Sequence, residues 1–195
     1  METQQQVILI VGLGNPGMEY RNSRHNVGFM VLEEVAQKLE IPLKRVKFKA
    51  QIGTGRFAGS SLVLAKPLTF MNNSGSAVVP LVRYFKISTD KILVIHDDLD
   101  LPMGTLRMRP AGGSAGQRGM QSIAESLGTN AFPRLRVGIG RPPGRMDPAD
   151  YVLKEFLPVD HELKKMVLEQ AAEAVLSFIQ DGLETAMNKY NGEIG

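Results

Sequence analysis

The sequence predicts a single three-layer α/β domain, in which helices flank a mixed, mostly parallel twisted sheet and a long helix closes the chain. Two observations support this fold. Apolar segments of strand length alternate with segments of helical periodicity, and the last segment bears the longest amphipathic stripe. The 195 residues contain no repeat, low-complexity segment or linker. We therefore expect one domain over residues 1–195, with a disordered polar start at 1–6.

The elements of the first half follow from apolar runs and turn residues. A strand is expected at 7–13, an apolar run that ends in the turn Gly14-Asn15-Pro16-Gly17. Apolar side chains then recur at helical spacing from Val27 to about Leu39 and predict a helix. The same patterns predict strands at 48–56 and 61–64, a helix at 74–85, and a strand at 91–95 that is apolar throughout and therefore central in the sheet.

The second half shows the same alternation. A short strand is expected at 105–108, and the glycine-rich segment 111–116 leads into a helix near 119–127. Another strand is expected at 135–139. From Leu163 to Met187, apolar residues recur at spacings of three, four and seven. This stripe predicts one long amphipathic helix that packs on the sheet, with its methionines in the core.

The composition excludes several classes of chemistry. There are no cysteines, so disulfides, thiolate metal sites and cysteine nucleophiles are ruled out, and a reducing compartment is compatible. No apolar run is long enough to cross a bilayer. The first residues are polar and lack the pattern of a signal peptide, so we expect a cytoplasmic protein.

Arginine is concentrated in one part of the chain. The net charge is only +3, but residues 107–145 hold seven arginines, no lysine and one acidic residue, Glu125. The planar guanidinium suits phosphate, so this bias indicates an anionic partner. The alternative is a solvated face whose counter-charges lie elsewhere in the fold.

The segment Gly12-Leu13-Gly14-Asn15-Pro16-Gly17 matches the G-x-G-x-x-G pattern of dinucleotide sites and follows a strand. Pro16 removes an amide donor that such a site needs, and no acidic residue closes a second strand about twenty residues later. A dehydrogenase is therefore disfavoured. The turn is better interpreted as presenting Asn15, whose amide can donate to an oxyanion or hold a substrate carbonyl. Asn15 as a plain turn former remains the alternative.

The three histidines differ in their setting. His161 begins the last helix and is expected to be exposed, whereas His96 ends a buried strand and is expected to be a satisfied core histidine. His25 lies at a loop-to-helix junction, off the apolar stripe, where a side chain can face a cleft. Histidine at such a place is suited to proton transfer, and a hydrogen bond at the helix start is the structural alternative.

Asp97 and Asp98 follow the carboxyl end of an apolar strand, the edge at which sites form in open α/β sheets. A carboxylate there could accept the second ring N–H of His25 and fix its tautomer. A metal site built from His96, Asp97, Asp98 and Asp100 is disfavoured, because successive strand residues point to opposite faces and no HExxH pair is present. No G-x-S-x-G motif supports a serine nucleophile.

Five blocks stand in order along the chain. They are Val11-Gly-Leu-Gly-Asn-Pro-Gly17, Arg24-His-Asn-Val-Gly28 with Tyr20 before it, Lys66-Pro-Leu-Thr-Phe-Met-Asn72, His96-Asp-Asp-Leu-Asp-Leu-Pro102 and Arg134-Leu-Arg-Val-Gly-Ile-Gly-Arg-Pro142. In order and spacing, these blocks resemble those of the bacterial peptidyl-tRNA hydrolase family. The similarity extends over nearly the whole chain, and the five blocks together are more specific than any one of them.

The resemblance implies hydrolysis of the ester bond between peptide and tRNA by a water that histidine activates, without metal, cofactor or covalent intermediate. His25 resembles the catalytic base and Asp97 the carboxylate that orients it. Asn15 and Asn72 resemble the amides that hold the substrate and stabilise the tetrahedral intermediate.

The resemblance also implies binding roles. Tyr20 and Met71 resemble residues that line the cleft near the tRNA 3′ end and the peptide. Arg107, Arg109 and Arg136 fall where the family carries basic residues that contact tRNA phosphate, in agreement with the arginine bias.

The chain departs from the family pattern at Gln117-Arg118-Gly119, where many members carry His-Asn before the glycine. The functional Asn is therefore not transferred to Arg118, which can only donate hydrogen bonds and is always charged. Arg118 is instead expected to contact a phosphate or carbonyl of the substrate at the cleft rim, beside a helix start that favours anions.

The implied partner is peptidyl-tRNA, with no membrane and no obligate protein partner, and the protein is expected to be a monomer. The main alternative is an RNA-binding relative without hydrolytic activity. The presence of His25, Asp97, Asn15 and Asn72 argues against it, because a binding protein has no need of that set.

Overall fold

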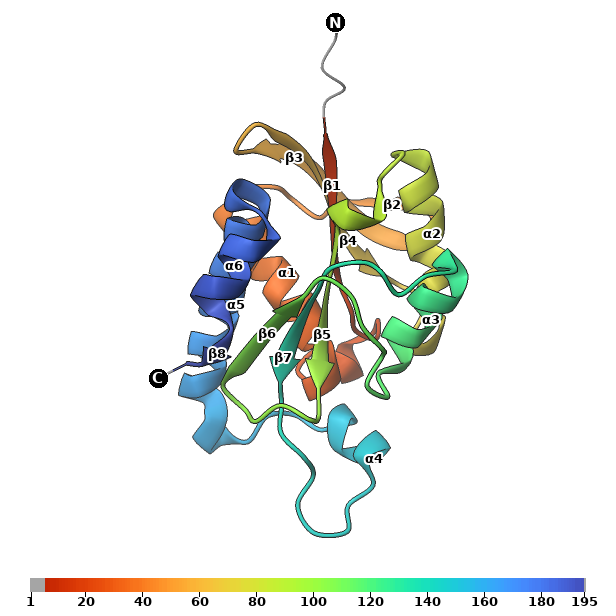
Figure 1. The fold of residues 1–195 in the computed structure, drawn as a ribbon. Coiled ribbons are helices and arrows are strands. Elements are labelled where there is room, and N and C mark those ends of the chain that lie inside the picture. Colours follow the sequence, from red (N-terminus) through yellow and green to blue (C-terminus); the bar gives the residue numbers. More distant parts are fainter. Residues whose placement is uncertain (1–5, 195) are drawn as a thin grey trace, which may run out of the picture.

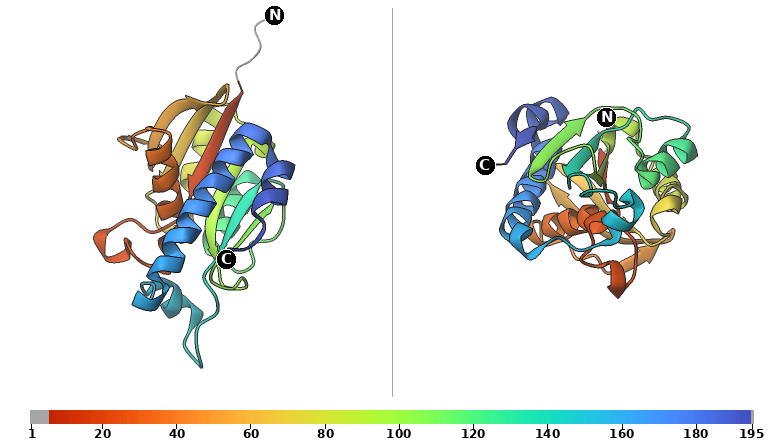
Figure 2. Two further views of the ribbon diagram at one scale, coloured as in Figure 1. Left: turned by 90° about the vertical axis from the view of Figure 1, so that its left-hand side faces the viewer. Right: turned by 90° about the horizontal axis from the view of Figure 1, so that it is seen from below.

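The computed structural model describes residues 6–194 and is built around an eight-stranded sheet with helices on both faces (Figures 1 and 2). The strands are β1 (Val7–Gly12), β2 (Arg45–Lys47), β3 (Ala50–Phe57), β4 (Ser60–Pro67), β5 (Ile92–Asp98), β6 (Thr105–Arg109), β7 (Arg134–Gly138) and β8 (Gly192–Glu193). The α-helices are α1 (Val27–Lys38), α2 (Gly75–Tyr84), α3 (Arg118–Leu127), α4 (Pro148–Leu153), α5 (His161–Asp181) and α6 (Leu183–Tyr190). Short 3-10 helices are η1 (Met18–Tyr20), η2 (Arg24–Asn26), η3 (Met71–Asn73), η4 (Thr89–Lys91) and η5 (Pro158–Asp160).

The sheet is mixed, as predicted, with the strand order β2-β3-β4-β1-β5-β7-β6-β8. The four central strands, β4, β1, β5 and β7, run parallel to one another. The outer strands β2, β3, β6 and β8 join antiparallel, so the parallel part of the sheet is its centre. Loop length explains part of this, because β2–β3 and β3–β4 are joined by two residues each and such turns connect only antiparallel neighbours.

Alternate residues of the central strands supply two hydrophobic layers. Ile8 and Ile10 of β1 pack in the larger core, with α1, α5 and α6, whereas Leu9 and Val11 pack in the second core, with α2 and α3. This alternation is the period of two that a strand imposes, and it produces the predicted three-layer architecture. In Figure 2 the long α5 lies across one face of the sheet.

The C-terminal segment differs from the prediction of one long helix. The helix breaks at Gly182, whose φ of 90° is left-handed, and α5 and α6 follow each other on either side of it. Glycine adopts this conformation without the steric cost that a side chain brings, so the chain can turn there although the apolar stripe continues. The strands β2 and β8 and the helix α4 were not predicted, because two or three residues are too few to show strand alternation and six are too few to show helical periodicity.

The predicted disordered start at 1–6 lies outside the described residues except for Gln6, whose carbonyl accepts a hydrogen bond from the Ser61 amide. Within residues 6–194, none of the helices combines the length and the apolar character that crossing a membrane requires.

Close packing of α1 on β1 places the start of α1 at the carboxyl edge of the sheet. A Cβ at Gly12 would lie 2.3 Å from the Gly28 carbonyl oxygen, and a Cβ at Gly28 would lie 2.4 Å from the Ile95 carbonyl oxygen. Only glycine fits at either position. The residues just before α1 are thereby held against the ends of β1 and β5, where a site is expected.

Candidate active site

A cleft of about 620 Å³ opens at the carboxyl ends of β1 and β5. Its walls come from the loop after β1, from η2 and η3, from the glycine-rich loop before α3, and from α4. The side chains that line it include Asn15, His25, Met71, Asn72, Asp97, Gln117 and Arg118. Most of the residues predicted to act on the substrate thus line one cavity.

His25 and Asp97 are in direct contact. Nδ1 of His25 lies 2.8 Å from Oδ2 of Asp97, and the two side chains are 14% and 3% exposed. An ionised carboxylate can only accept, so Nδ1 carries the proton and Nε2 of the neutral ring is the basic nitrogen. Nε2 has no hydrogen-bond partner within residues 6–194. The pair has the arrangement that lets a histidine act as a general base.

The second oxygen of Asp97 is held by a residue that the sequence did not assign to the site. Nε2 of Gln117 donates to Oδ1 of Asp97 over 3.1 Å, and it also lies 3.1 Å from Sδ of Met71. Oε1 of the same side chain accepts from the Met120 amide and caps α3. The position of Gln117 just before a helix start indicates a cap in the sequence, but no pattern in the neighbouring residues indicates its contact with Asp97.

Asn15 is fixed by two backbone contacts and one side-chain contact. Its backbone N–H donates to Oδ1 of Asn26 over 2.8 Å, and its backbone carbonyl accepts from Nδ2 of Asn26 over 2.9 Å. Oδ1 of Asn15 accepts from the Met71 amide over 2.7 Å. Because this oxygen is occupied, the NH₂ group of Asn15 remains available to the cleft as a donor. Asn26, which is buried, is the positioning residue here, and no pattern in the neighbouring sequence pointed to its contacts with Asn15.

The remaining predicted substrate contacts lie on one wall. Met71 is buried and Asn72 is exposed at the start of η3, and both line the cleft. Tyr20 does not line the cavity itself. Its ring lies edge-on to Phe70, with centroids 6.4 Å apart, and Phe70 lines the cleft and is 52% exposed. Tyr20 therefore belongs to the rim.

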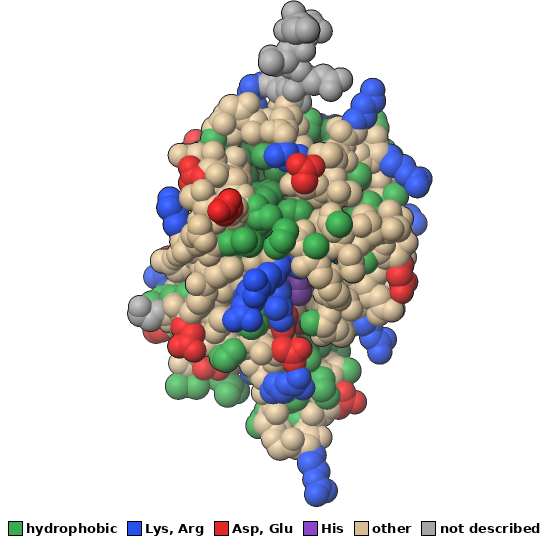
Figure 3. All heavy atoms as spheres, in the orientation of Figure 1, with side chains coloured by type: hydrophobic (Ala, Val, Ile, Leu, Met, Phe, Trp, Pro, Cys, Tyr) green, Lys and Arg blue, Asp and Glu red, His purple; other side chains and the backbone are tan. Residues whose placement is uncertain are grey.

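The predicted phosphate-binding arginines lie outside the cavity. Arg107 and Arg136 face each other across β6 and β7, and Arg109 is exposed at the end of β6. Arg136 is tied to the cleft through Asp98, whose Oδ2 lies 2.6 Å from its Nε. Figure 3 shows basic side chains gathered over β6 and β7 near the centre of this face. Arg118, in contrast, is exposed and lines the cleft directly.

A buried arginine fastens η2 to α4. Arg24 is 5% exposed, and its guanidinium lies over the Tyr151 ring at 4.2 Å and donates to the carbonyls of Tyr151 and Lys154. The Arg24 amide donates to the same Lys154 carbonyl over 3.0 Å. His25 is the next residue, so this contact fixes the backbone that carries the predicted base.

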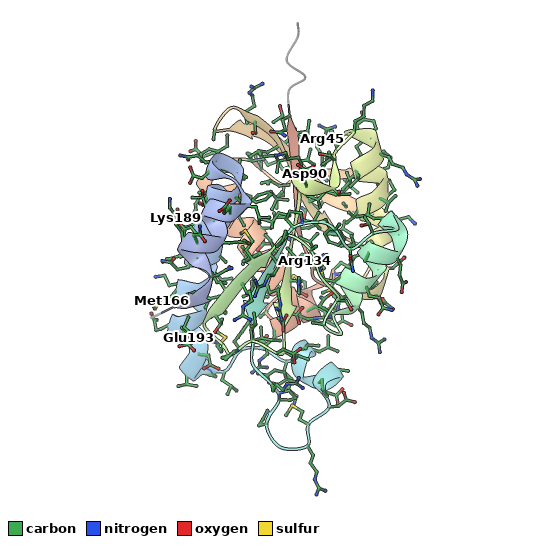
Figure 4. The ribbon with its side chains drawn as sticks, in the orientation of Figure 1. Arg45, Asp90, Arg134, Met166, Lys189 and Glu193 are labelled. Carbon is green, nitrogen blue, oxygen red and sulfur yellow. The ribbon has the colours of Figure 1, made fainter. Side chains whose placement is uncertain are left out.

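A second buried arginine secures the glycine-rich wall. Arg134 donates to the carbonyls of Gly112, Gly113, Asn130 and Phe132. Figure 4 shows it near the centre of the molecule, where the loop to α3 passes the strands. Burial, followed by the nearby charge of Arg136, lowers the pKa of Arg134 to about 10. The side chain therefore stays charged at neutral pH and serves the loop rather than the substrate.

His96 lies against Asp97 from the core side, as predicted for a satisfied core histidine. It is 2% exposed, and its Nδ1 lies 2.8 Å from the Asp97 carbonyl oxygen. Burial lowers its pKa and keeps the ring neutral. Among residues 6–194, no group of three or more histidine or carboxylate side chains is arranged to hold a metal ion. Asp98 and Asp100 are instead engaged by Arg136 and Arg141.

The sequence and the fold both match known proteins. Residues 9–194 match the family model described as "Peptidyl-tRNA hydrolase". The peptidyl-tRNA hydrolase of Moorella thermoacetica is 50% identical over 186 residues, which are 95% of this chain and 98% of that one. The peptidyl-tRNA hydrolase of Syntrophomonas wolfei is 48% identical over 183 residues, which are 94% of this chain and 99% of the relative.

A solved structure agrees with both. The crystal structure of peptidyl-tRNA hydrolase from Acinetobacter baumannii superposes with a TM-score of 0.90 at 37% identity, and the match covers 96% of this chain and 95% of that one. Identity of this degree over nearly the full length leaves no other assignment for the fold. The chain belongs to the peptidyl-tRNA hydrolase family.

Proposed function

We propose that the chain hydrolyses peptidyl-tRNA with His25 as general base, Asp97 as its orienting partner and Asn15 as oxyanion donor. The reaction of the family, which releases tRNA from peptidyl-tRNA, is the reaction of this chain. The observation that supports the assignment of residues is the 2.8 Å contact of His25 with Asp97 inside a cleft that also holds the free amide of Asn15.

The proposed first step is attack by water. Nε2 of His25 takes a proton from a water molecule while the oxygen attacks the carbonyl carbon of the ester, and the carbonyl π electrons move to oxygen. Asp97 stabilises the imidazolium that forms, because its Oδ2 already accepts the Nδ1 proton. The NH₂ group of Asn15 donates to the developing oxyanion, a contact worth about 3 kcal/mol in comparable sites.

The second step is collapse of the tetrahedral intermediate. The oxyanion re-forms the carbonyl, the bond to the ribose oxygen breaks, and the imidazolium returns its proton to that oxygen. Collapse gives a tRNA hydroxyl and a peptide carboxylic acid, which releases its remaining proton to solvent to become the carboxylate, and His25 is neutral again. The ribose alkoxide of an ester leaves more readily than the amine of an amide. These two steps therefore need neither a covalent intermediate nor a redox partner.

Substrate binding is assigned to the remaining predicted residues. Met71 and Asn72 would contact the ester end in the cleft, with Tyr20 supporting Phe70 at the rim. Arg107, Arg109 and Arg136 would hold phosphates beyond the cleft, and Arg118 would contact a phosphate or carbonyl at its edge. All of these side chains come from one chain, so a monomer is sufficient to form the site.

Peptidyl-tRNA arises during translation, and we therefore propose that the protein acts in the cytoplasm.

The test is turnover of N-acetyl-aminoacyl-tRNA by His25→Ala, measured with EDTA present. Loss of the general base should lower kcat roughly 10²–10⁴-fold while tRNA affinity stays within about twofold. His161→Ala removes an exposed histidine at the start of α5 and serves as the matched control. Near-normal turnover by the His25 variant would refute the assigned base. Binding of tRNA without turnover by the wild type would instead favour the non-hydrolytic RNA-binding relative.

A further inference from the structure

A tight hairpin at the edge of the sheet has an unusual pair of turn residues. β2 and β3 pair with Lys47 opposite Ala50, so Phe48 and Lys49 alone make the turn. Both are left-handed, with φ of 50° and 60°. Two-residue turns of this kind favour Asn-Gly, because a larger side chain at positive φ costs free energy. The turn therefore bears a local strain at two positions that carry a phenyl ring and an ammonium group.

The same surface carries a high density of positive charge. Six cationic side chains lie on the hairpin and at the end of α2, and the segments 41–49 and 81–87 that supply them contain no acidic residue. Within residues 6–194 none of the six forms an ion pair, although seven such pairs occur elsewhere in that range. We call this surface the hairpin patch; its cations are Lys44, Arg45, Lys47, Lys49, Arg83 and Lys86.

Aromatic rings are interleaved with these charges. Phe48 and Tyr84 are 37% and 55% exposed, and their rings meet edge-to-face at 5.4 Å. The Lys47 ammonium lies 3.6 Å from the centroid of the Tyr84 ring. A hydrogen bond from Lys47, together with the charges of Lys47 and Arg45, lowers the pKa of Tyr84. The patch thus combines cations that form no ion pair among the described residues with exposed aromatic rings. Such cations bind phosphates, and such rings stack against bases.

The patch is joined to the cleft wall through the backbone. The Leu68 amide donates to the Lys49 carbonyl over 2.8 Å, and Phe70 and Met71 of the cleft follow directly in the chain. Figure 3 shows basic side chains over α2 on the same face as the basic group over β6 and β7. Six strand spacings separate β2 from β6, which is about 29 Å at roughly 4.8 Å each. One RNA molecule the size of a tRNA can span that distance.

We infer that the hairpin patch is a second RNA-binding surface, which contacts the body of the tRNA outside its 3′ end. The inference rests on the proposed function for the identity of the RNA. Lys49 and the α2 cations supply phosphate contacts, and Phe48 supplies a ring against a base or ribose. Asn-Gly at this turn would relieve the strain but would remove both contacts.

The central experiment exploits that strain. The double variant Phe48→Asn/Lys49→Gly installs the preferred turn residues, so its Tm should equal or exceed that of the wild type. Its Kd for deacylated tRNA should nevertheless rise roughly tenfold at physiological salt, and the slope of log K against log salt should become shallower by about 0.9 for the lost phosphate contact. Unchanged affinity and slope would overturn the inference.

A second variant avoids the turn. Arg83→Gln/Lys86→Gln removes one cation in the last turn of α2 and one just after it, and should weaken tRNA binding with a change in salt slope of about 1.5–2. Lys164→Gln/Lys165→Gln makes the same charge change on α5 and should leave both quantities unaltered. Equal losses in the two double variants would show a general charge effect and would overturn the inference.

Two kinds of substrate separate this inference from the proposed function. On full-length N-acetyl-aminoacyl-tRNA the hairpin variants should raise KM and leave kcat unchanged. On the same ester carried by a CCA trinucleotide, which lacks the tRNA body, kcat/KM should equal that of the wild type. Failure of the wild type to cleave either substrate would count against the proposed function. If the variants lose binding to vesicles of anionic lipid but keep tRNA affinity, the partner is a membrane and the inference is wrong.

Discussion

The two walls of the cleft are built in different ways. On the wall after β1, Asn15, Asn26 and Met71 are buried and joined by hydrogen bonds of 2.7–2.9 Å. On the opposite wall, the loop 111–116 is mostly exposed, and a Cβ added at Gly112, Gly113 or Gly116 would find nothing within 4 Å. The first wall is packed and hydrogen-bonded throughout, whereas the second is held at Gly112 and Gly113 by Arg134 and otherwise faces open space.

This difference fits the two tasks of the proposed site, which are to position the reacting groups and to bind the rest of the substrate. A base and an oxyanion donor act only when their atoms are held near the reacting bond, and the residues with those proposed roles lie on the rigid side. The glycine-rich wall presents Arg118, which is proposed to contact an anion of variable position. Gln117 joins the two, because it caps α3 and also holds Asp97.

The largest effect is expected where the rigid wall is broken. Asn26→Ala removes both partners of the Asn15 backbone and leaves a buried N–H and a buried C=O unsatisfied, which should cost about 2–4 kcal/mol of unfolding free energy. Turnover should fall roughly 10²-fold, because the Asn15 amide loses its position. Urea unfolding and kcat measure the two effects. Asn73→Ala, at an exposed position of η3, should change neither; a mild Asn26 phenotype would contradict a rigid wall.

The comparison also shows what the sequence can and cannot predict about the fold. The strand at 7–13 and the helix at 27–39 were predicted because their apolar patterns are local, and both are confirmed within one residue of β1 and α1. The break at Gly182 was missed, since the stripe continues across it and only the backbone conformation changes. The antiparallel outer strands depend on which strands pair, and that is a property of the assembled sheet.

The same limit applies to the site. His25 and Asp97 lie 72 positions apart, and their contact was anticipated from the setting of each residue together with the family resemblance. Gln117 and Asn26 were not assigned, because their partners come from other elements and leave no mark on the neighbouring sequence. Residues that support functional groups are therefore harder to find than the functional groups themselves.

Gln117→Glu tests the junction between the two walls and should have the next largest effect. The new side chain keeps an oxygen for the Met120 amide, so the cap of α3 and the Tm should be preserved. It loses the donor to Asp97 and places a second carboxylate about 3 Å from the first, so the two cannot both stay ionised without cost. We expect kcat to fall roughly 10–100-fold and the acidic limb of the pH–rate profile to move to higher pH.

A control for the added charge lies one turn further along α3. Gln121 bonds Glu125 on the exposed surface, and Gln121→Glu should leave the pH–rate profile unchanged. Gln117→His places a ring N–H donor at this position, as the sequence pattern of many family members does. Its kcat should therefore lie between that of Gln117→Glu and that of the wild type. If Gln117→Glu and Gln121→Glu behave alike, Gln117 has no positioning role.

A smaller effect is expected on the looser wall. Arg118→Asn removes an exposed cation from the cleft and should raise KM for N-acetyl-aminoacyl-tRNA about three- to tenfold while kcat changes less than threefold. The split follows because Arg118 contacts neither His25 nor Asp97 among the hydrogen bonds of the described residues. Steady-state kinetics on one defined substrate measure it. A loss confined to kcat would place Arg118 among the groups that act in the transition state.

The smallest effect is expected at Gly113, and Gly119 provides the comparison with a tightly packed glycine. Gly113→Ala adds a methyl group into open space, and its unfolding free energy should stay within about 0.5 kcal/mol of the wild type, with turnover within about twofold. Gly119→Ala makes the same change at the base of the loop, where the new atom would lie 2.5 Å from Sδ of Met71 and 2.8 Å from Cδ1 of Leu13. That variant should lose about 1–3 kcal/mol, because both neighbours are packed against the rigid wall. Equal tolerance of the two substitutions would mean that the walls do not differ in rigidity, and a marked loss at Gly113 would mean that the glycine-rich loop is itself held in one position.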